Sequence, residues 1–274
     1  MKKQPTAIQF SEAEVAFGKQ SFVFDDIYGK NITIQYKRKR VRDCFEKHLP
    51  AQANILELNA GTGEDTLYFA EKGYLIHATD VSADMLFHLQ QKAATLKEAD
   101  NITTEKISFT ELNNLKHQKQ YDAIFSNFGG LNCAEDLSVV LQSFNSLLKP
   151  DGIVTMVIMP RFCLWEFLLI LKGDFKTALR RFKGGKSGAT AHIDGVYFKC
   201  WYYSPFYIIK YLKNNFELLG VEGLCTIVPP SYHESFPVKF PKLFRVLCKT
   251  EDILKSIFPF NLIGDYYIIS LKRK

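Results

Sequence analysis

The chain lacks a long hydrophobic run and any cysteine motif that would bind metal or build a disulfide framework. Its longest apolar stretch, FCLWEFLLIL, is interrupted by Glu166 and is far shorter than the roughly 20 residues that a membrane-spanning helix needs. The six cysteines are scattered without a CxxC pair, which favours small buried thiols in a reducing compartment. The polar N-terminus, MKKQPTAIQFSEAE, has no signal-peptide core. We therefore expect a cytoplasmic protein without a bound metal.

The chain also lacks a strong charge imbalance. Its 274 residues include 35 basic and 29 acidic side chains, a net charge of +6 that does not indicate a nucleic-acid partner. A hydrophobic content of 47% and a charged content of 23% are typical of a soluble globular protein. The length suffices for one elaborated domain with a large core, but it does not predict the oligomeric state.

Complete phosphate-binding motifs are missing as well. Residues 55–66, ILELNAGTGEDT, form an apolar run that ends in a turn with Gly61 and Gly63. Thr66 occupies the place of the third glycine of a dinucleotide fingerprint, and no G-K-[ST] follows, so the P-loop is excluded. Glu57 adds a carboxylate beside the turn, which disfavours a pyrophosphate and favours a cationic ligand.

From residue 53 onward, apolar strands alternate with amphipathic helices. This alternation predicts a doubly wound, Rossmann-like α/β sheet of seven mostly parallel strands with an antiparallel last strand, GDYYIISLKRK. The first 31 residues are mixed and aromatic, and within them FVFDDIYGKN is interpreted as an irregular or short helical entry. The expected early strands are NILELN, YLIHATD, KISFT, YDAIFSN and IVTMVIM.

After Pro160 the composition becomes aromatic, with 22 of the 38 aromatic residues in the last 115 positions. We expect two insertions on the ligand side of the sheet: a lid of helix and hairpin around Asp194-Gly195, and an aromatic helical segment at about 231–260. The predicted organisation is an N-terminal helical cap (1–50), a nucleotide-binding core (51–160), the α+β lid (161–204) and the end of the core sheet (205–274).

Asp80 supports a nucleoside ligand. It ends the second strand 19 residues beyond Gly61, close to the offset of about 20 residues at which a carboxylate takes ribose hydroxyls. Its alternative role is a negative charge at a helix start, although Ser82 already supplies the cap. A nucleoside without phosphate and with positive charge matches S-adenosylmethionine (SAM), whose demethylated product is S-adenosylhomocysteine (SAH).

Four segments together resemble class I SAM-dependent methyltransferases, and among them the group of ubiquinone/menaquinone C-methyltransferases: ILELNAGTGEDT, ATDVSADML, YDAIFSNFGGLN and LLKPDGIVTM. The resemblance covers about residues 24–160. It departs at Asn59 and Ala60, where glycine or cysteine is usual, and at Glu111, which is longer than the customary aspartate.

The resemblance implies a role for each matching position. The methionine moiety of the cofactor would be held by Glu57 and by the backbone around Asn59, Ala60 and Gly61, and the ribose by Asp80; Gly63 would let the backbone approach the cofactor closely. The other implied cofactor contacts are Val81, Met85, Glu111 and Leu112 near the adenine, Asn127 and Phe128 beside the sulfonium, and Tyr28 as a closing side chain.

The acceptor is expected to be a small apolar or aromatic molecule, such as a phenol, quinone precursor or lipid-like metabolite. His192 and Tyr197 are candidate catalytic residues, with a structural histidine as the alternative for His192, and Trp165, Tyr202 and Tyr203 are candidate substrate contacts. The fourth strand ends in SNFGG, so the D/N-P-P-F/Y pattern of amino-directed DNA methylases is absent.

The basic lid segment KGDFKTALRRFKGGKSG leaves other partners open. It is interpreted as a solvated face, but it is also compatible with an RNA or protein substrate or with peripheral contact to an anionic membrane. A SAM-binding protein without catalytic activity is a further alternative.

Overall fold

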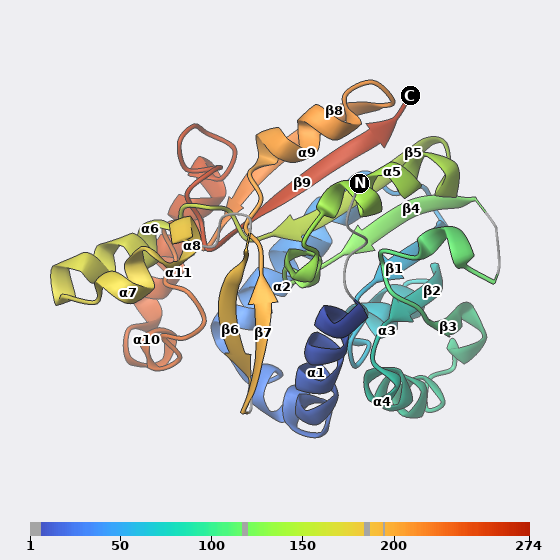
Figure 1. The fold of residues 1–274 in the computed structure, drawn as a ribbon, viewed down its shortest axis with the longest axis horizontal. Helices are drawn as coiled ribbons and strands as arrows, with labels where there is room; N and C mark the ends of the chain where they lie inside the picture. Colours follow the sequence, from blue (N-terminus) through green and yellow to red (C-terminus); the bar gives the residue numbers. More distant parts are fainter. Residues whose placement is uncertain (1–6, 117–119, 184–186, 194) are drawn as a thin grey trace.

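The computed structural model describes residues 7–274 except 117–119, 184–186 and 194. Within these residues, seven strands form one sheet in the order β3-β2-β1-β4-β5-β9-β8 (Figure 1). Strands β1 to β5 are parallel, and β9 runs antiparallel to both β5 and β8, which confirms the predicted fold class. The strands are β1 (Asn54–Leu58), β2 (Leu75–Asp80), β3 (Ile102–Lys106), β4 (Tyr121–Ser126), β5 (Leu148–Ile158), β8 (Phe216–Leu224) and β9 (Tyr266–Arg273).

Both faces of the sheet are buried, which explains the nearly continuous apolar runs of its central strands. Alternation along β1 and β4 sends Leu56 and Ile124 to one face and Ile55 and Phe125 to the other. The first face packs against α5 (Leu137–Leu147) and α9 (Pro205–Leu212). The second packs against α2 (Ile32–Glu46), α3 (Glu64–Glu71) and α4 (Ala83–Ala93). The short 3₁₀ segments are η1 (Ala99–Asn101), η2 (Leu112–Asn114) and η3 (Gly130–Cys133).

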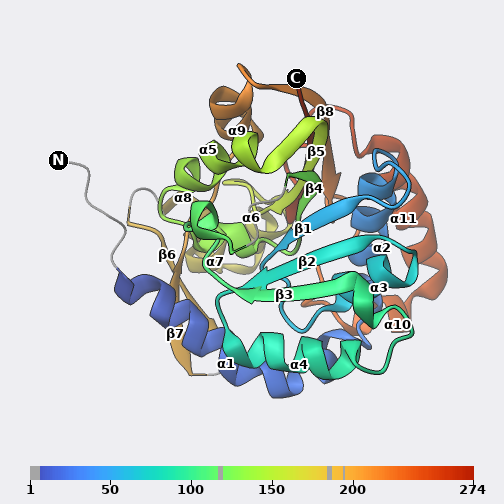
Figure 2. The same ribbon diagram turned by 90° about the vertical axis from the view of Figure 1, so that its right-hand side faces the viewer.

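The start of the chain is helical: α1 (Ala7–Tyr28) has 22 residues and lies beside α4 (Figure 2). Of the two interpretations of FVFDDIYGKN, the structure therefore supports the helical one, within a longer helix. The prediction of a third strand at KISFT is wrong, because β3 ends at Lys106, although Ile107 N–H still bonds β2, at the Asp80 carbonyl. Tertiary contacts stabilise α1, because Phe17 packs on Phe198 with ring centroids 5.6 Å apart.

The first insertion follows β5 and contains short helices and a hairpin. Its elements are α6 (Leu164–Phe167), η4 (Leu168–Lys172), α7 (Phe175–Ala178), α8 (Arg180–Lys183), β6 (Ala189–Ile193) and β7 (Val196–Cys200). The buried Glu166 joins them, since it accepts hydrogen bonds from Arg180 and Arg181, and Arg181 also pairs with Asp265 at 2.9 Å. The antiparallel pairing of β6 with β7 confirms the predicted hairpin around Gly195; Asp194 lies outside the described residues.

The second insertion, between β8 and β9, contains α10 (Ser235–Lys239) and α11 (Pro241–Leu254). One buried carboxylate fixes it to the core. Glu251 accepts hydrogen bonds from four consecutive backbone N–H groups, those of residues 225–228, at 2.8 to 2.9 Å. Arg40 on α2 lies 3.4 Å from the same carboxylate.

None of the described helices combines the length and the apolar character that a membrane span requires.

We predict that Glu251→Gln lowers the free energy of unfolding by about 3 kcal/mol, because an amide NH₂ would face buried backbone donors and leave them unpaired. Chemical denaturation measures the change. The control is Asp252→Asn on the half-exposed neighbour, with an expected loss of about 0.5 kcal/mol or less. Equal losses in the two variants would contradict the anchoring role of Glu251.

Candidate functional site

The glycine turn joins β1 to α3 at the carboxyl end of the parallel strands. Asn59, Gly61 and Gly63 all have left-handed backbone, with φ of 48°, 59° and 86°. A Cβ atom on Gly63 would lie 2.5 Å from Cγ of Leu89, so this position requires glycine for space as well as for backbone conformation. The side chain of Asn59 holds the turn against β4, accepting from Ser126 Oγ at 2.6 Å and donating to the Asn127 carbonyl at 3.0 Å.

Three backbone donors of the turn are engaged by the protein. Ala60 N–H donates to the Thr79 carbonyl at 3.0 Å, and Gly63 N–H donates to the Ala60 carbonyl at 3.1 Å. Gly61 N–H donates to Oδ2 of Asp80 at 2.9 Å. This arrangement differs from a phosphate-binding loop, in which the N–H groups point at the ligand.

Asp80 ties the second strand to the turn. Its Oδ1 accepts from Ser82 N–H at 2.9 Å, while Oδ2 accepts from Gly61. Burial raises the pKa of this carboxyl, and the backbone hydrogen bonds oppose the rise. Each carboxylate oxygen retains a second lone pair, so a neighbouring diol remains within its hydrogen-bonding capacity.

Glu57 lies inside β1 and is fully buried. Among the described residues, its carboxyl accepts one hydrogen bond, from Thr66 Oγ1 at 2.5 Å, and its backbone carbonyl accepts another from Thr79 Oγ1 at 2.8 Å. Burial, followed by the charge of Asp65, raises the pKa of Glu57 to about 8. Near neutral pH the unliganded carboxyl is therefore mostly protonated, and the negative charge expected at this position from the sequence lies instead on Asp65.

Asp65, in the first turn of α3, is the charged centre beneath the turn, and the sequence interpretation missed it. Arg38 and Arg42 bind its two oxygens at 2.8 and 2.7 Å, and Asn127 Nδ2 donates to it at 2.8 Å. Burial raises the pKa of Asp65, but the two arginines prevail and the net direction is downward. The available sequence signal was the four-residue spacing of Arg38 and Arg42, which places them on one face of a helix.

Aromatic and cationic side chains surround the ends of β4 and β9. The half-buried Phe128 has left-handed backbone, with φ of 51°. Its ring lies 4.8 Å from the Arg38 guanidinium carbon, and Lys37 Nζ lies 4.8 Å from the ring centroid of Tyr266. Arg38 is itself buried, and its Nε has no hydrogen-bond partner. This corner therefore combines apolar rings with an unused N–H donor.

Helix α1 reaches the turn from the other side. Asp25 accepts hydrogen bonds from Thr62 Oγ1 at 2.7 Å and from Lys92 Nζ at 2.8 Å. The side chain of Tyr28, three residues further along, lies outside the described part of the structure, so its closing role stays a prediction.

The four residues assigned to the adenine differ in exposure. Val81 is half-buried directly after Asp80, whereas Met85 and Leu112 are almost completely buried. Glu111 is exposed and precedes η2. The structure thus brings Val81 next to Asp80 and leaves the contacts of the other three as predictions.

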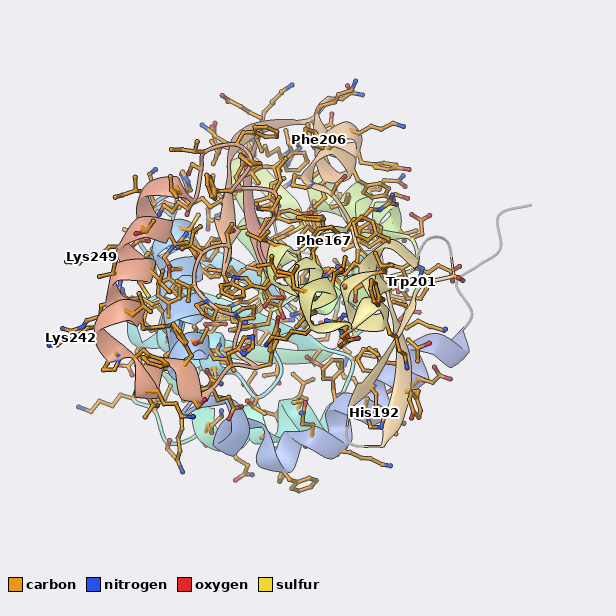
Figure 3. The ribbon with its side chains drawn as sticks, turned by 90° about the vertical axis from the view of Figure 1, so that its left-hand side faces the viewer. Phe167, His192, Trp201, Phe206, Lys242 and Lys249 are labelled. Atoms are coloured by element: carbon orange, nitrogen blue, oxygen red, sulfur yellow. The ribbon has the colours of Figure 1, made fainter. Side chains whose placement is uncertain are left out.

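The two catalytic candidates lie near the turn of the lid hairpin, away from the end that joins the core. His192 and Tyr197 pair across β6 and β7 with ring centroids 4.6 Å apart, and both are exposed. Figure 3 shows His192 and Trp201 at opposite ends of this hairpin. The end near Trp201 is the one fixed to the core. Trp201 N–H donates to the Asn132 carbonyl at 2.7 Å, and the side-chain amide of Asn132 donates through Nδ2 to the Trp201 carbonyl at 2.6 Å.

The substrate candidates are mostly engaged in packing. The hydroxyl of Tyr203 donates to the carbonyls of Ala134 and Glu135, on the far side of the sheet from Arg38. Tyr202 is buried beneath the Arg181 guanidinium, 5.2 Å from its ring centroid. Trp165 is half-buried near His233, and its indole Nε1 has no partner. Of the three, Trp165 has the polar atom that is not yet used.

One cluster has metal-ligand chemistry. The ligand atoms of Cys163, Glu166 and Asp265 lie within 4.8 Å of one another and are buried. Arg181 already occupies this space, bonding Glu166 Oε1 at 2.6 Å and Asp265 Oδ1 at 2.9 Å. The cluster is therefore an ion-pair network, and a cation would have to displace the arginine.

Comparison with known proteins agrees with this geometry. Residues 55–152 match the model of a family described as a methyltransferase domain. YqeM of Bacillus subtilis, whose methyltransferase assignment is itself provisional, is 31% identical over 113 residues, which span 40% of this chain and 44% of YqeM. MJ1252 of Methanocaldococcus jannaschii, a protein of uncharacterised function, is 28% identical over 211 residues, 77% of this chain and 76% of its own.

A solved structure shares the whole fold. The 1,6-didemethyltoxoflavin N1-methyltransferase of Burkholderia thailandensis, with bound 1,6-didemethyltoxoflavin and SAH, superposes with a TM-score of 0.57 at 13% identity. The match covers 100% of this chain and 92% of that one. The fold is therefore the one found in class I SAM-dependent methyltransferases, and residues 55–152 are similar to a methyltransferase domain. Together these findings support the prediction of a SAM-dependent methyltransferase.

We predict that Asp65→Asn lowers the free energy of unfolding by about 4 kcal/mol, because it leaves the buried Arg38 and the nearby Arg42 without their counter-charge. Denaturant titration checks this, with Glu64→Gln as the control; Glu64 pairs with Lys92 but is more exposed. A loss in Asp65→Asn no larger than in the control would contradict the central position of Asp65.

Proposed function

We propose that the protein binds SAM at the glycine turn and transfers its methyl group to a small apolar or aromatic acceptor. The observation that carries the proposal is the turn itself: the N–H groups of Ala60, Gly63 and Gly61 donate to Thr79, Ala60 and Asp80, so these three donors are not available to a phosphate. Buried carboxyl groups surround the turn instead. A nucleoside ligand with positive charge suits such a site.

Each part of the cofactor has a candidate partner. The ribose hydroxyls would bind Asp80, with Val81 against the adenine. The ammonium group of the cofactor's methionine part would bind near Glu57 and the carbonyls of the turn. The carboxylate of the same part would accept a hydrogen bond from the unpaired Nε–H of Arg38. When bound, SAM supplies an electrophilic methyl group. Asn127 and Phe128 end β4 and would position that group toward the acceptor.

The acceptor proposal rests on the half-buried rings of Phe128 and Tyr266. Their ring centroids lie 6.5 Å apart in a T-shaped arrangement. A pocket lined by such rings suits an apolar or aromatic molecule better than a polymer. Methyl transfer gains chiefly from alignment and exclusion of water, and a general base is needed only for an acceptor whose reacting atom carries a proton of high pKa. A quinone precursor is one acceptor of this kind.

The alternative of an RNA or protein substrate loses support from the lid. Arg180 and Arg181, the central charges of the basic segment, both pair with Glu166 at 2.6 Å. The exposed position of His192 and Tyr197 likewise weighs against a role as general base in the unliganded state. Their catalytic role and the cytoplasmic location stay predictions from the sequence.

We predict that intact protein binds SAH in calorimetry at micromolar concentrations and that Asp80→Asn weakens binding by about 100-fold, through loss of charged hydrogen bonds to the ribose and of the turn geometry. Asp84→Asn, four residues on at the exposed start of α4, is the matched control and should bind as the wild type does. Absence of SAH binding by folded wild-type protein would overturn the proposed function.

The pKa of Glu57 gives a second prediction. The free carboxyl is protonated below about pH 8, and the ligand's ammonium favours its ionised form, so SAH binding should release a proton. Affinity then rises with pH between about 6 and 8, by at most about tenfold per unit. Calorimetry in buffers of different ionisation enthalpy measures the release.

Glu57→Gln is the control for this experiment, because the ligand's own ammonium titrates equally in both proteins. The variant should lose the rise in affinity. Its unliganded form should also lose the decline in stability that the raised pKa imposes as pH increases from about 4.5 to 8. Identical pH profiles for the two proteins would contradict the role assigned to Glu57.

A further inference from the structure

The second insertion exposes an unusual amount of apolar surface. Eight of the 23 exposed large hydrophobic side chains in the described residues lie between Tyr232 and Phe258. On α11, Leu243, Val246 and Ile253 follow each other at helical spacing on one face, and Ile253 is 72% exposed. The strip continues beyond both helix ends through Val238, Phe240, Ile257 and Phe258. Contiguous apolar surface of this kind marks an interaction site.

Positive charges are interspersed along the same strip. Lys242 and Lys249, seven residues apart, project outward from α11 at the edge of the molecule (Figure 3), and Lys239 precedes them on α10. All three are exposed, and in the described part of the chain none of them forms an ion pair. The acidic residues near the strip are Glu234 and Asp252, and Asp252 is paired with Arg40 at 3.4 Å.

The opposite face of α11 already packs against the core, so the exposed strip is not the face with which this helix packs on the protein. Phe244 is buried and packs on Tyr36 of α2 with ring centroids 6.1 Å apart. Glu251, on the same buried face, holds the four backbone N–H groups of residues 225–228. The helix thus presents its apolar and basic side to the outside in a rigid orientation.

We propose that this surface, defined by Val238, Lys239, Phe240, Lys242, Leu243, Val246, Lys249, Ile253, Ile257 and Phe258, docks onto an anionic lipid membrane. An amphipathic helix in the plane of an interface inserts its apolar residues while its lysines reach the headgroup phosphates. A second copy of the chain fits less well, because two such strips would oppose lysine to lysine. The basic charge complements anionic lipid and repels itself.

The docking surface is connected to the ligand side of the sheet. In the loop that precedes α10, Ser231 Oγ accepts from Lys37 Nζ at 3.1 Å, and the ring of His233 lies 6.2 Å from that of Trp165. Lys37 in turn faces the rings of Phe128 and Tyr266. The docking surface is thus joined, through residues 231–233 and Lys37, to the side chains that surround Phe128 and Tyr266.

The test is co-sedimentation of the full chain with vesicles of phosphatidylglycerol and phosphatidylcholine, compared with pure phosphatidylcholine. Wild-type protein should partition onto the anionic vesicles only, and high salt should release it. Lys239→Gln/Lys242→Gln/Lys249→Gln should lower the partition coefficient by about 100-fold, from about fivefold per lysine. Val246→Ser/Ile253→Ser should lower it at least about tenfold.

Matched controls are Lys97→Gln/Lys210→Gln/Lys213→Gln and Phe206→Ser, which alter exposed residues elsewhere; they should bind as the wild type does. Circular dichroism verifies that every variant is folded. No binding of wild-type protein to anionic vesicles, or equal losses in strip and control variants, would overturn the proposal. Light scattering that shows a dimer which the strip variants dissociate, without vesicle binding, would also overturn it and assign the surface to a second copy.

Discussion

The site depends on the ion pairs that the buried carboxylate of Asp65 forms with Arg38 and Arg42. Asp65 lies at the start of α3 and joins this helix to α2 through Arg38 and Arg42 and to the end of β4 through Asn127. The glycine turn directly precedes α3, so these contacts of Asp65 also fix the position of the residue that follows the turn. Its charge helps to keep Glu57 protonated until a cation arrives. The charge of Asp65 thus contributes both to the stability of the site and to its preference for a cationic ligand.

The turn illustrates how similar glycine patterns serve different ligands. In a phosphate site the backbone N–H groups are left free and the helix start supplies positive potential. Here the N–H groups of Ala60, Gly61 and Gly63 bond within the protein, and carboxyl groups occupy the adjacent strand ends. The glycines then serve tight turning and close helix packing, as the contact of Gly63 with Leu89 requires. The ligand chemistry is set by the carboxyl groups.

The alternating core was predictable from the sequence because both faces of its central strands are buried and their apolar runs are bounded by turns. The positions of Asp80 and of the glycine turn were predictable because each directly follows an apolar run. The hairpin around Gly195 was predictable from the glycine at its turn. The partnership of Asp65 with Arg38 was not, since 27 residues separate them and only the tertiary fold joins them. Similarly, α1 owes its length to packing on β7 and α4, and Tyr203 looked like a substrate contact although its hydroxyl serves two backbone carbonyls.

The central claim is that the turn selects a cationic nucleoside and rejects phosphates. Equilibrium binding of SAM and of ATP to the same intact protein, at equal concentration and without added metal, tests it most directly. The account predicts saturable micromolar binding of SAM and none of ATP up to millimolar concentration. Binding of ATP with an affinity equal to or above that of SAM would show that the backbone N–H groups of the turn are available to phosphate, and would contradict the account.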